Sequence, residues 1–219
     1  MSDKNSSEFS SENLKNKRTE SILSAGAQLF LKNGIENVKM TDIAERSGVG
    51  VATLYRYFGT KTRIVTEVMT YLWNDLRDLF GGIFDSEVFV SQTGIKQLTD
   101  LMRMFTVLYT AHKDFMKLLG EFDRFAVSAE IPKEELTEYE RSVIDFYPVL
   151  ENAFKKGCED GTVRQGIDFR LFYLTFTHAL TEMCKKFING AVLPSEDFSD
   201  AEKELDMLIE TAVYYLEVR

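Results

Sequence analysis

Side chains able to bind a polyanion gather between Thr53 and Lys61. Tyr55, Arg56 and Tyr57 stand next to one another in the middle of this stretch. Hydroxyl, guanidinium and ammonium groups donate hydrogen bonds to phosphate oxygens, and an arginine can also read base edges. The segment therefore favours nucleic-acid binding over catalysis.

Residues suited to catalysis or metal binding are sparse. The two histidines are His112 and His178, and His178 stands four residues before Glu182 on one predicted helix face. Such a pair could hold a metal ion only with a third ligand, and the nearby sequence offers none. Gly48 and Gly50 lack the third glycine of a nucleotide-binding loop, and no Gly-x-Ser-x-Gly motif occurs. We expect no catalytic residue, no metal and no cofactor, although turnover that vanished on mutating His178 would favour an enzyme.

Two short helices are expected to position the polyanion-binding side chains. The first begins near Met40 and is broken by the glycine-containing segment 47–50. The second runs from Val51, and its residues Leu54 and Phe58 lie one turn apart and face inward. A helix presented in this way fits a major groove, which is about 12 Å wide, so the pattern predicts a helix-turn-helix. The residues expected to point outward are Ala52, Thr53 and Arg56, flanked by Tyr55 and Tyr57.

The stretch from Gly48 to Lys61, G-V-G-V-A-T-L-Y-R-Y-F-G-T-K, resembles the TetR family of bacterial one-component regulators. The family pattern is roughly I-A-x-x-A-G-V-S-x-x-T-L-Y-x-Y-F-x-x-K, and the clear similarity covers about residues 17–65. The matching positions in this motif are Ile43, Ala44, Gly48, Val49, Thr53, Leu54, Tyr55, Tyr57, Phe58 and Lys61. The preceding helix is also similar, at Ala25, Leu29, Phe30 and Gly34, with Gly26 in place of a second alanine.

The resemblance implies a set of DNA contacts, with two departures from the family pattern. Lys39 and Gly50 stand where relatives commonly place a serine or threonine cap, and a lysine there could bind a phosphate instead. Val51 replaces a polar base reader, which leaves apolar contact with a thymine methyl group. The implied phosphate contacts are Thr53, Tyr55 and Lys61, and the implied base contacts are Val51, Ala52 and Tyr57. Arg56 is implied to lie near the DNA backbone or a base. Lys39 and Thr41 complete the DNA-binding set.

The whole chain predicts an all-α fold, because prolines are few and no alternating strand pattern occurs. We expect a disordered tail at 1–16, a three-helix DNA-binding domain at 17–65 and a larger helical effector-binding and dimerisation domain at 66–219. The first helix should begin at Thr19 and end at Asn33, and a long linking helix should run from Lys61 to Phe80, where Gly81 and Gly82 stop it. Further helices are expected over about 95–109, 113–125, 132–158 with a kink or break at Pro148, 168–189 with Asp168 as cap, and 199–216 with a Ser199–Glu202 capping box.

Charge is divided unevenly along the 219 residues. Residues 1–66 hold 10 Lys/Arg and 7 Asp/Glu, a net of +3, whereas residues 67–219 hold 16 and 28, a net of −12. A basic head on an acidic body favours one orientation on DNA.

The two cysteines, Cys158 and Cys184, form no paired motif. The first 17 residues contain no apolar stretch and no 18-residue apolar run occurs, so we expect neither a signal peptide nor a membrane span. We expect a cytoplasmic protein with no membrane association.

The resemblance further implies that the last two helices form a homodimer through a four-helix bundle, so that two heads read a palindromic operator. The apolar seam of Leu205, Ile209, Ala212 and Leu216 fits that implication, and packing within one chain is the alternative. Relatives also hold an effector in the second domain, and a small apolar or aromatic ligand is expected here. The candidate lining residues are Phe105, Tyr109, Phe122, Phe125, Phe146, Tyr147, Phe172, Phe176, His178 and Met183.

The mechanism implied by the resemblance is repression relieved by ligand. The effector would favour a dimer whose heads are wrongly spaced for the groove, and DNA would favour the other spacing. The helix from Lys61 to Phe80 would carry this movement. The alternative is a DNA-binding regulator controlled by a protein partner, with no small-molecule effector, and activation in place of repression also stays open.

Overall fold

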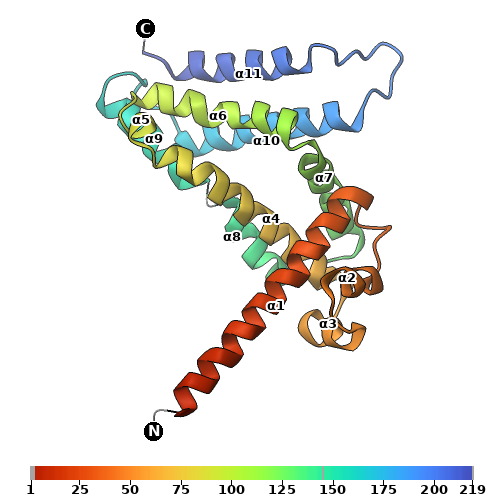
Figure 1. Cartoon of the computed structure of the whole chain (residues 1–219). Coiled ribbons are helices and arrows are strands. Elements are labelled where there is room, and N and C mark those ends of the chain that lie inside the picture. The colour runs from red at the N-terminus through yellow and green to blue at the C-terminus, as the bar shows by residue number, and fades with distance from the viewer. Residues whose placement is uncertain (1–2, 145, 219) are drawn as a thin grey trace. The chain divides into compact units, whose positions relative to one another are not determined.

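The computed structural model describes the backbone of residues 3–144 and 146–218, and the side chains of 14–143 and 146–218. Its elements are helices, apart from an isolated bridge between Val163 and Glu217, and this confirms the predicted all-α fold (Figure 1). The helices are α1 (Asp3–Asn33), α2 (Met40–Ser47), α3 (Val51–Phe58), α4 (Lys61–Phe84), α5 (Glu87–Val90), α6 (Gly94–Ala111), α7 (Lys113–Ser128), α8 (Thr137–Ile144), α9 (Tyr147–Glu159), α10 (Phe169–Asn189) and α11 (Ala201–Leu216), with a 3-10 turn at Lys133–Leu136.

The chain packs as two compact units. Unit 1 contains Met1–Asn74 and Glu121–Ser142, and unit 2 contains Asp75–Gly120 and Val143–Arg219. The helices α4 and α7 each contribute residues to both units. The packing unit around the DNA-binding helices is thus larger than the predicted 17–65 segment, whose bounds as a functional domain stay a prediction.

Unit 1 has an apolar core built from the faces of α1, α3 and α4. Gly26 lets α1 approach α4 closely, because a Cβ added to it would lie 2.8 Å from Cγ2 of Val68. This contact explains why glycine stands where the family pattern has alanine. The fully buried side chains of this core include Ile22, Phe30, Leu54, Ile64, Val68 and Met69.

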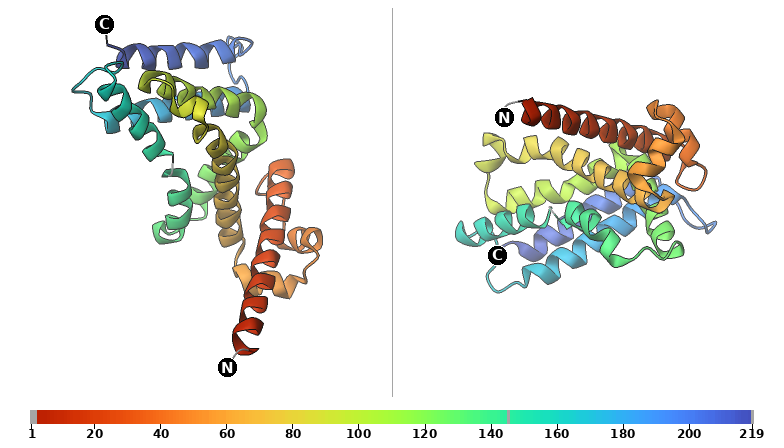
Figure 2. Two further views of the ribbon diagram at one scale, coloured as in Figure 1. Left: turned by 60° about the vertical axis from the view of Figure 1, so that its left-hand side comes forward. Right: turned by 90° about the horizontal axis from the view of Figure 1, so that it is seen from below.

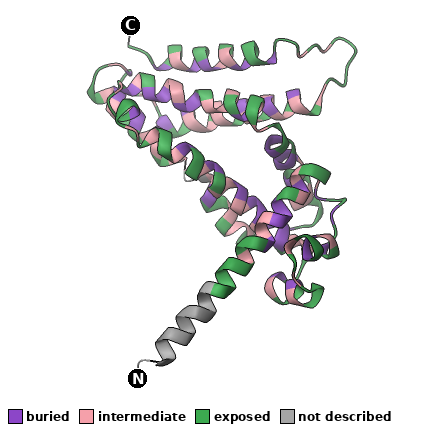
Figure 3. Cartoon of the chain, in the orientation of Figure 1, coloured by how far each residue is buried: buried purple, intermediate pink, exposed green. Residues whose placement is uncertain are grey.

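Unit 2 is organised around α6, which is flanked by α9, α10 and α11 (Figure 2). The predicted seam of α11 is buried, at Leu205, Ile209, Ala212 and Leu216, and α11 lies along α6 of the same chain (Figure 3). The interpretation of that seam as a dimer surface was therefore wrong, since apolar periodicity identifies the buried face of a helix but not its partner. Exposed side chains of α11 lie on its opposite face, and they include Met207 and Tyr214.

Several helix ends differ from the prediction. Helix α1 begins at Asp3, so residues 3–16 are helical and not disordered, and the hydroxyl of Thr19 donates to the Lys15 carbonyl inside the helix instead of capping it. Extending an existing helix costs little, and the Glu, Leu and Lys residues of this segment favour it. Helix α4 continues through Gly81 and Gly82 to Phe84, because two glycines cost only about 2 kcal/mol and the Phe84 ring stacks on Phe80.

Two helix starts were predicted wrongly, and one helix break and one cap were predicted correctly. Helix α11 has Asp200 as its N-cap without a side-chain bond, so the Ser199–Glu202 capping box is absent at that helix start; the Ser199 amide instead donates to Asp197. Pro132 precedes a 3-10 turn instead of opening a long helix. The expected break at Pro148 is present, with the proline in the first turn of α9, and Asp168 caps α10 by accepting from Leu171.

Candidate nucleic-acid interface

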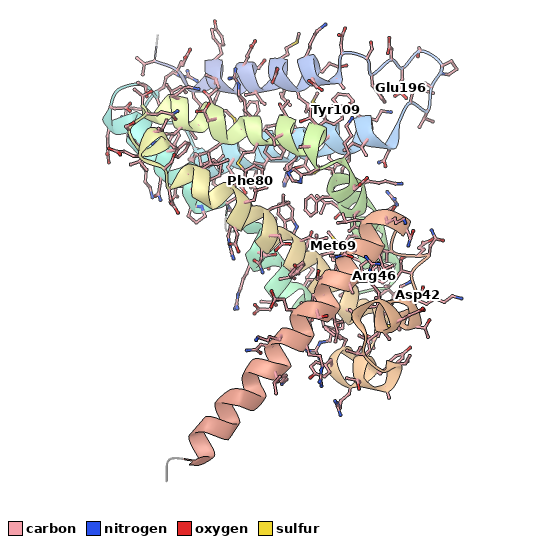
Figure 4. The ribbon with its side chains drawn as sticks, viewed as in Figure 1. Asp42, Arg46, Met69, Phe80, Tyr109 and Glu196 are labelled. Carbon is pink, nitrogen blue, oxygen red and sulfur yellow. The ribbon has the colours of Figure 1, made fainter. Side chains whose placement is uncertain are left out.

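The two short helices α2 and α3 meet at a tight glycine turn. Gly48 has φ 69°, in the left-handed region, and the C-cap amide bonds close the end of α2 on Ala44 and Glu45. Gly50 then starts α3 in an extended conformation, without a side-chain cap. The observed bounds match the predicted helix-turn-helix. Arg46 holds α2 against α1, since its Nη2 donates to Oε1 of Gln28 at 2.6 Å (Figure 4).

The start of α2 is held by an aspartate and not by its N-cap residue. The Lys39 ammonium has no lone pair to accept an amide hydrogen. Oδ2 of Asp42 accepts from the Lys39 amide at 2.8 Å, which is the return half of a capping box. The Lys39 side chain and the neighbouring Thr41 are exposed. Asp42 thus ties the start of α2 to the Lys39 backbone, although Lys39 itself supplies no capping oxygen.

The outer face of α3 presents the predicted contact residues. Leu54 and Phe58 are buried, and Val51, Ala52, Tyr55 and Arg56 are exposed. Thr53 and Tyr57 are half-buried, and the guanidinium carbon of Arg56 lies 5.9 Å from the centre of the Tyr57 ring. The inward and outward placement follows the sequence prediction, while the role of each side chain in binding stays a prediction.

Lys61 lies at the first turn of α4, where Oγ1 of Thr60 accepts the Arg63 amide at 3.1 Å. Its Nζ donates to the Glu36 carbonyl at 3.3 Å. Partial burial lowers the pKa of Lys61, and the carboxylates of Glu36 and Asp42 oppose that shift. The lysine predicted as a phosphate contact therefore also makes a bond within unit 1, which the sequence did not indicate.

The comparison with known families places this segment. Residues 22–68 match the model of "Bacterial regulatory proteins, tetR family". The chain belongs to the TetR family. It is a DNA-binding transcriptional regulator and not an enzyme.

The similarity to proteins of this family extends beyond the DNA-binding segment. The transcriptional repressor KstR2 of Rhodococcus jostii is 26% identical over 167 residues, which are 72% of this chain and 72% of that protein. The regulator FadR of Bacillus subtilis, solved with stearoyl-CoA, has a TM-score of 0.64 at 16% identity and covers 90% of this chain and 98% of its own. A regulator from Saccharomonospora viridis, solved with choline, has a TM-score of 0.68 at 16% identity and covers 93% and 100%. The fold of the whole chain is therefore that of TetR-family regulators.

The predicted effector residues of this TetR-family chain do not form one group. Phe122 and Phe125 belong to unit 1, where the Phe122 ring packs 4.7 Å from Tyr139. His178 is exposed on α10, so its side chain is no buried polar anchor in the single chain. The remaining predicted residues lie in unit 2, at Phe105, Tyr109, Phe146, Tyr147, Phe172, Phe176 and Met183.

Part of this set does meet in an aromatic cluster of unit 2. Tyr147 lies 5.4 Å from Phe169 and 4.8 Å from Tyr173, and Phe172 lies 4.8 Å from Phe176, as ring centres. Burial raises the pKa of Tyr147, and nearby Glu151 raises it further. Phe169 and Tyr173 were not predicted as lining residues, although they stand one turn apart on the same helix as Phe172 and Phe176.

The alternative metal pair at His178 lacks support from its neighbours. Glu182 forms an ion pair with Lys185 at 2.8 Å. Across the residues with described placement, no three His, Cys, Asp or Glu side chains gather as metal ligands would.

Among the residues that the structure describes, no helix combines the length and the apolar character needed to cross a bilayer.

A cleft of about 850 Å³ lies within unit 1. No predicted effector residue lines it. Its walls come from α1, α4 and the region around α8, and they include Leu23, Arg63, Glu67, Tyr71, Asn74 and Glu138.

Proposed function

We propose that the chain is a homodimeric repressor that binds a palindromic operator through α3 and is released by a small apolar or aromatic ligand. The observation that carries the DNA-binding part is the exposed face of α3 around Tyr55 and Arg56, on a helix anchored by Leu54 and Phe58. A helix anchored on one face can place its other face in a major groove. Repression is supported by the relative KstR2, which is named a repressor.

The proposed contacts divide into two kinds. Phosphate contacts fix the position of the head, and the net charge of +3 over residues 1–66 supports them. Contacts with base edges select the sequence, and the exposed methyl groups of Val51 suit a thymine methyl. Phosphates are contacted by Lys39, Thr41, Thr53, Tyr55 and Lys61, bases by Val51, Ala52 and Tyr57, and either by Arg56.

Dimerisation uses the outward faces of α10 and α11. Leu171 is 64% exposed, Met207 67% and Tyr214 59%, and apolar side chains of this size on two neighbouring helices favour burial against a second copy. Four helices from two copies would then form a bundle. A two-fold dimer places two heads on two half-sites, which requires a palindrome.

The effector is proposed to bind in unit 2 at the aromatic cluster around Tyr147, Phe172 and Phe176. Regulators with this fold were solved with stearoyl-CoA and with choline, so the fold accepts ligands of very different chemistry. The rings lining the cluster favour an apolar or aromatic ligand here. Because these rings already contact one another at about 5 Å, control by a protein partner is the alternative. Thermal-shift screening of a diverse library would decide, since no shift with any compound would support the partner.

Operator binding is tested by selecting sites from a random duplex library with purified wild-type protein and with Arg56→Ala. The matched control is Arg103→Ala, which removes the same charge from an exposed position of α6. We expect wild type and Arg103→Ala to select one palindrome, and Arg56→Ala to bind it about tenfold more weakly. Folded wild-type protein that selects no site at low salt would refute the proposed function.

A further inference from the structure

The turn between α1 and α2, residues 34–37, is held by a residue far away in sequence. Oε2 of Glu121, on α7, accepts from the Ile35 amide at 3.0 Å. Gly34 has φ 79°, and a Cβ added to it would lie 2.7 Å from the same oxygen. The carboxylate therefore occupies space that only a glycine leaves open, and the turn is shaped to receive it.

A second distant side chain holds the adjacent backbone group. Nζ of Lys61, on α4, donates to the Glu36 carbonyl at 3.3 Å. The donor and the acceptor of neighbouring residues in one turn are thus bound by α7 and α4. Both helices continue into unit 2, with residues 113–120 of α7 and 75–84 of α4.

The turn leads directly into the DNA-binding helices. Oδ2 of Asp42 accepts from the Lys39 amide, so the start of α2 is tied to the backbone that precedes it. Ile35 in the turn and Val38 directly after it are each 1% exposed, and they anchor the turn in the core. A displacement of the turn would therefore be passed to α2 and, through their packing, to α3.

We propose that Glu121 is a positioning residue for DNA binding, which holds the α1–α2 turn so that α2 and α3 present their outer face to an operator. This inference rests on the proposed function. The acceptor oxygen must reach the Ile35 amide, and a movement of α7 would withdraw it. Neither Glu121 nor this turn belongs to the predicted DNA contacts, so its effect on binding is indirect.

The test separates reach from charge. Glu121→Asp keeps the charge but shortens the side chain by one methylene, whereas Glu121→Gln keeps the reach and an acceptor oxygen. We expect Glu121→Asp and Glu121→Ala to bind the selected palindrome at least about tenfold more weakly, and Glu121→Gln to stay within about threefold of wild type. Glu134→Ala removes an exposed carboxylate of unit 1 and is the matched control, with wild-type binding expected.

Two further readouts distinguish positioning from stability. Hydrogen exchange should show the Ile35 amide less protected in Glu121→Asp than in wild type or Glu121→Gln, at a temperature where every variant is folded. The salt dependence of binding should keep its slope, because no phosphate contact is removed. The ratio of specific to non-specific affinity should fall, which a purely structural role below the unfolding transition would not produce.

The failures are distinguishable. Glu121→Asp and Glu121→Ala binding the palindrome as wild type does, with only their melting temperature lowered, would overturn this inference and leave the proposed function intact. Binding of the palindrome by Glu121→Gln as weak as that by Glu121→Ala would also overturn the inference, since the charge of the side chain and not its length would then matter. Wild-type protein that selects no site would refute the proposed function, and this inference would be refuted with it.

Discussion

The crossing of α6 and α9 in unit 2 offers a sharp test of the packing. Gly94 and Gly157 meet there, and a Cβ added to Gly94 would lie 2.0 Å from the Gly157 nitrogen, 2.3 Å from its Cα and 2.6 Å from the Ala153 carbonyl oxygen. These are backbone atoms, which no rotamer change can move away. Ordinary van der Waals contact begins near 3.4 Å. The Gly94→Ala substitution must therefore move the two helices apart by more than about 1 Å.

The cost follows from what such a movement breaks. The Gly94 amide donates to Oδ2 of Asp160 at 2.8 Å, and the Ile95 amide donates to Oγ1 of Thr162 at 3.2 Å. Losing one charged and one neutral hydrogen bond costs about 2 to 3 kcal/mol. Strain from overpacking adds about 1 to 3 kcal/mol. We expect Gly94→Ala to lower the free energy of unfolding by about 4 kcal/mol, a large part of the total for a protein of this size.

Urea unfolding followed by circular dichroism measures the effect. The control is Gly82→Ala, in the last turn of α4, where an added Cβ has no neighbour within 4 Å. That substitution should stabilise the protein by about 0.5 to 1 kcal/mol, because alanine favours the helix. Equal stability of Gly94→Ala and Gly82→Ala would show that the helices tolerate separation, and the reasoning from backbone contact would fail.

Three further predictions concern the oligomer, the thiols and one acidic side chain. The double variant Met207→Glu, Tyr214→Glu should sediment as a monomer in sedimentation velocity. The control variant Val127→Glu changes an apolar side chain of α7 that is 80% exposed, and it should stay dimeric. The reverse pattern would exclude α11 from the interface. Burial raises the pKa of Cys184 to about 12, so a thiol reagent should label only Cys158, which is partly exposed, in the native chain and both cysteines in urea; equal rates would contradict this. The ammonium of Lys186 and the amides of Leu193 and Val192 hold the pKa of Glu196 at about 2. This stabilisation is fully present above the ordinary pKa of 4.5 and is lost as the pH falls toward 2. The Val192 amide should therefore lose protection from hydrogen exchange over that pH range. Glu196→Gln should abolish this dependence of protection on pH.

The DNA-binding helices could be predicted from the sequence because their signals are local. Gly48 and Gly59 adopt positive φ values at the ends of α2 and α3, and glycine is the residue that marks such ends. Leu54 and Phe58 identify the buried side of α3 without knowledge of what covers it. The predicted outward residues followed from that one choice.

The second unit could be predicted only in part, because its signals depend on distant contacts. The apolar seam of α11 was correctly placed as a buried face, but α6, which covers it, is about a hundred residues earlier in the chain. A second copy would have satisfied the same pattern. For the same reason Phe122 and Phe172 were predicted to line one pocket although they belong to different units, since aromatic residues at helical spacing do not indicate which unit they join.

The contact of Glu121 with the α1–α2 turn illustrates this limit at a functional position. It joins residues 86 apart, and no motif within either segment indicates it. The outer face of α3 identifies what the protein binds, whereas the orientation of that face depends on backbone bonds from α4 and α7. A substitution of Glu121 on α7 should therefore alter operator binding without touching a predicted DNA contact. Regulation in this chain is then expected to depend on residues that sequence similarity to a DNA-binding motif does not reveal.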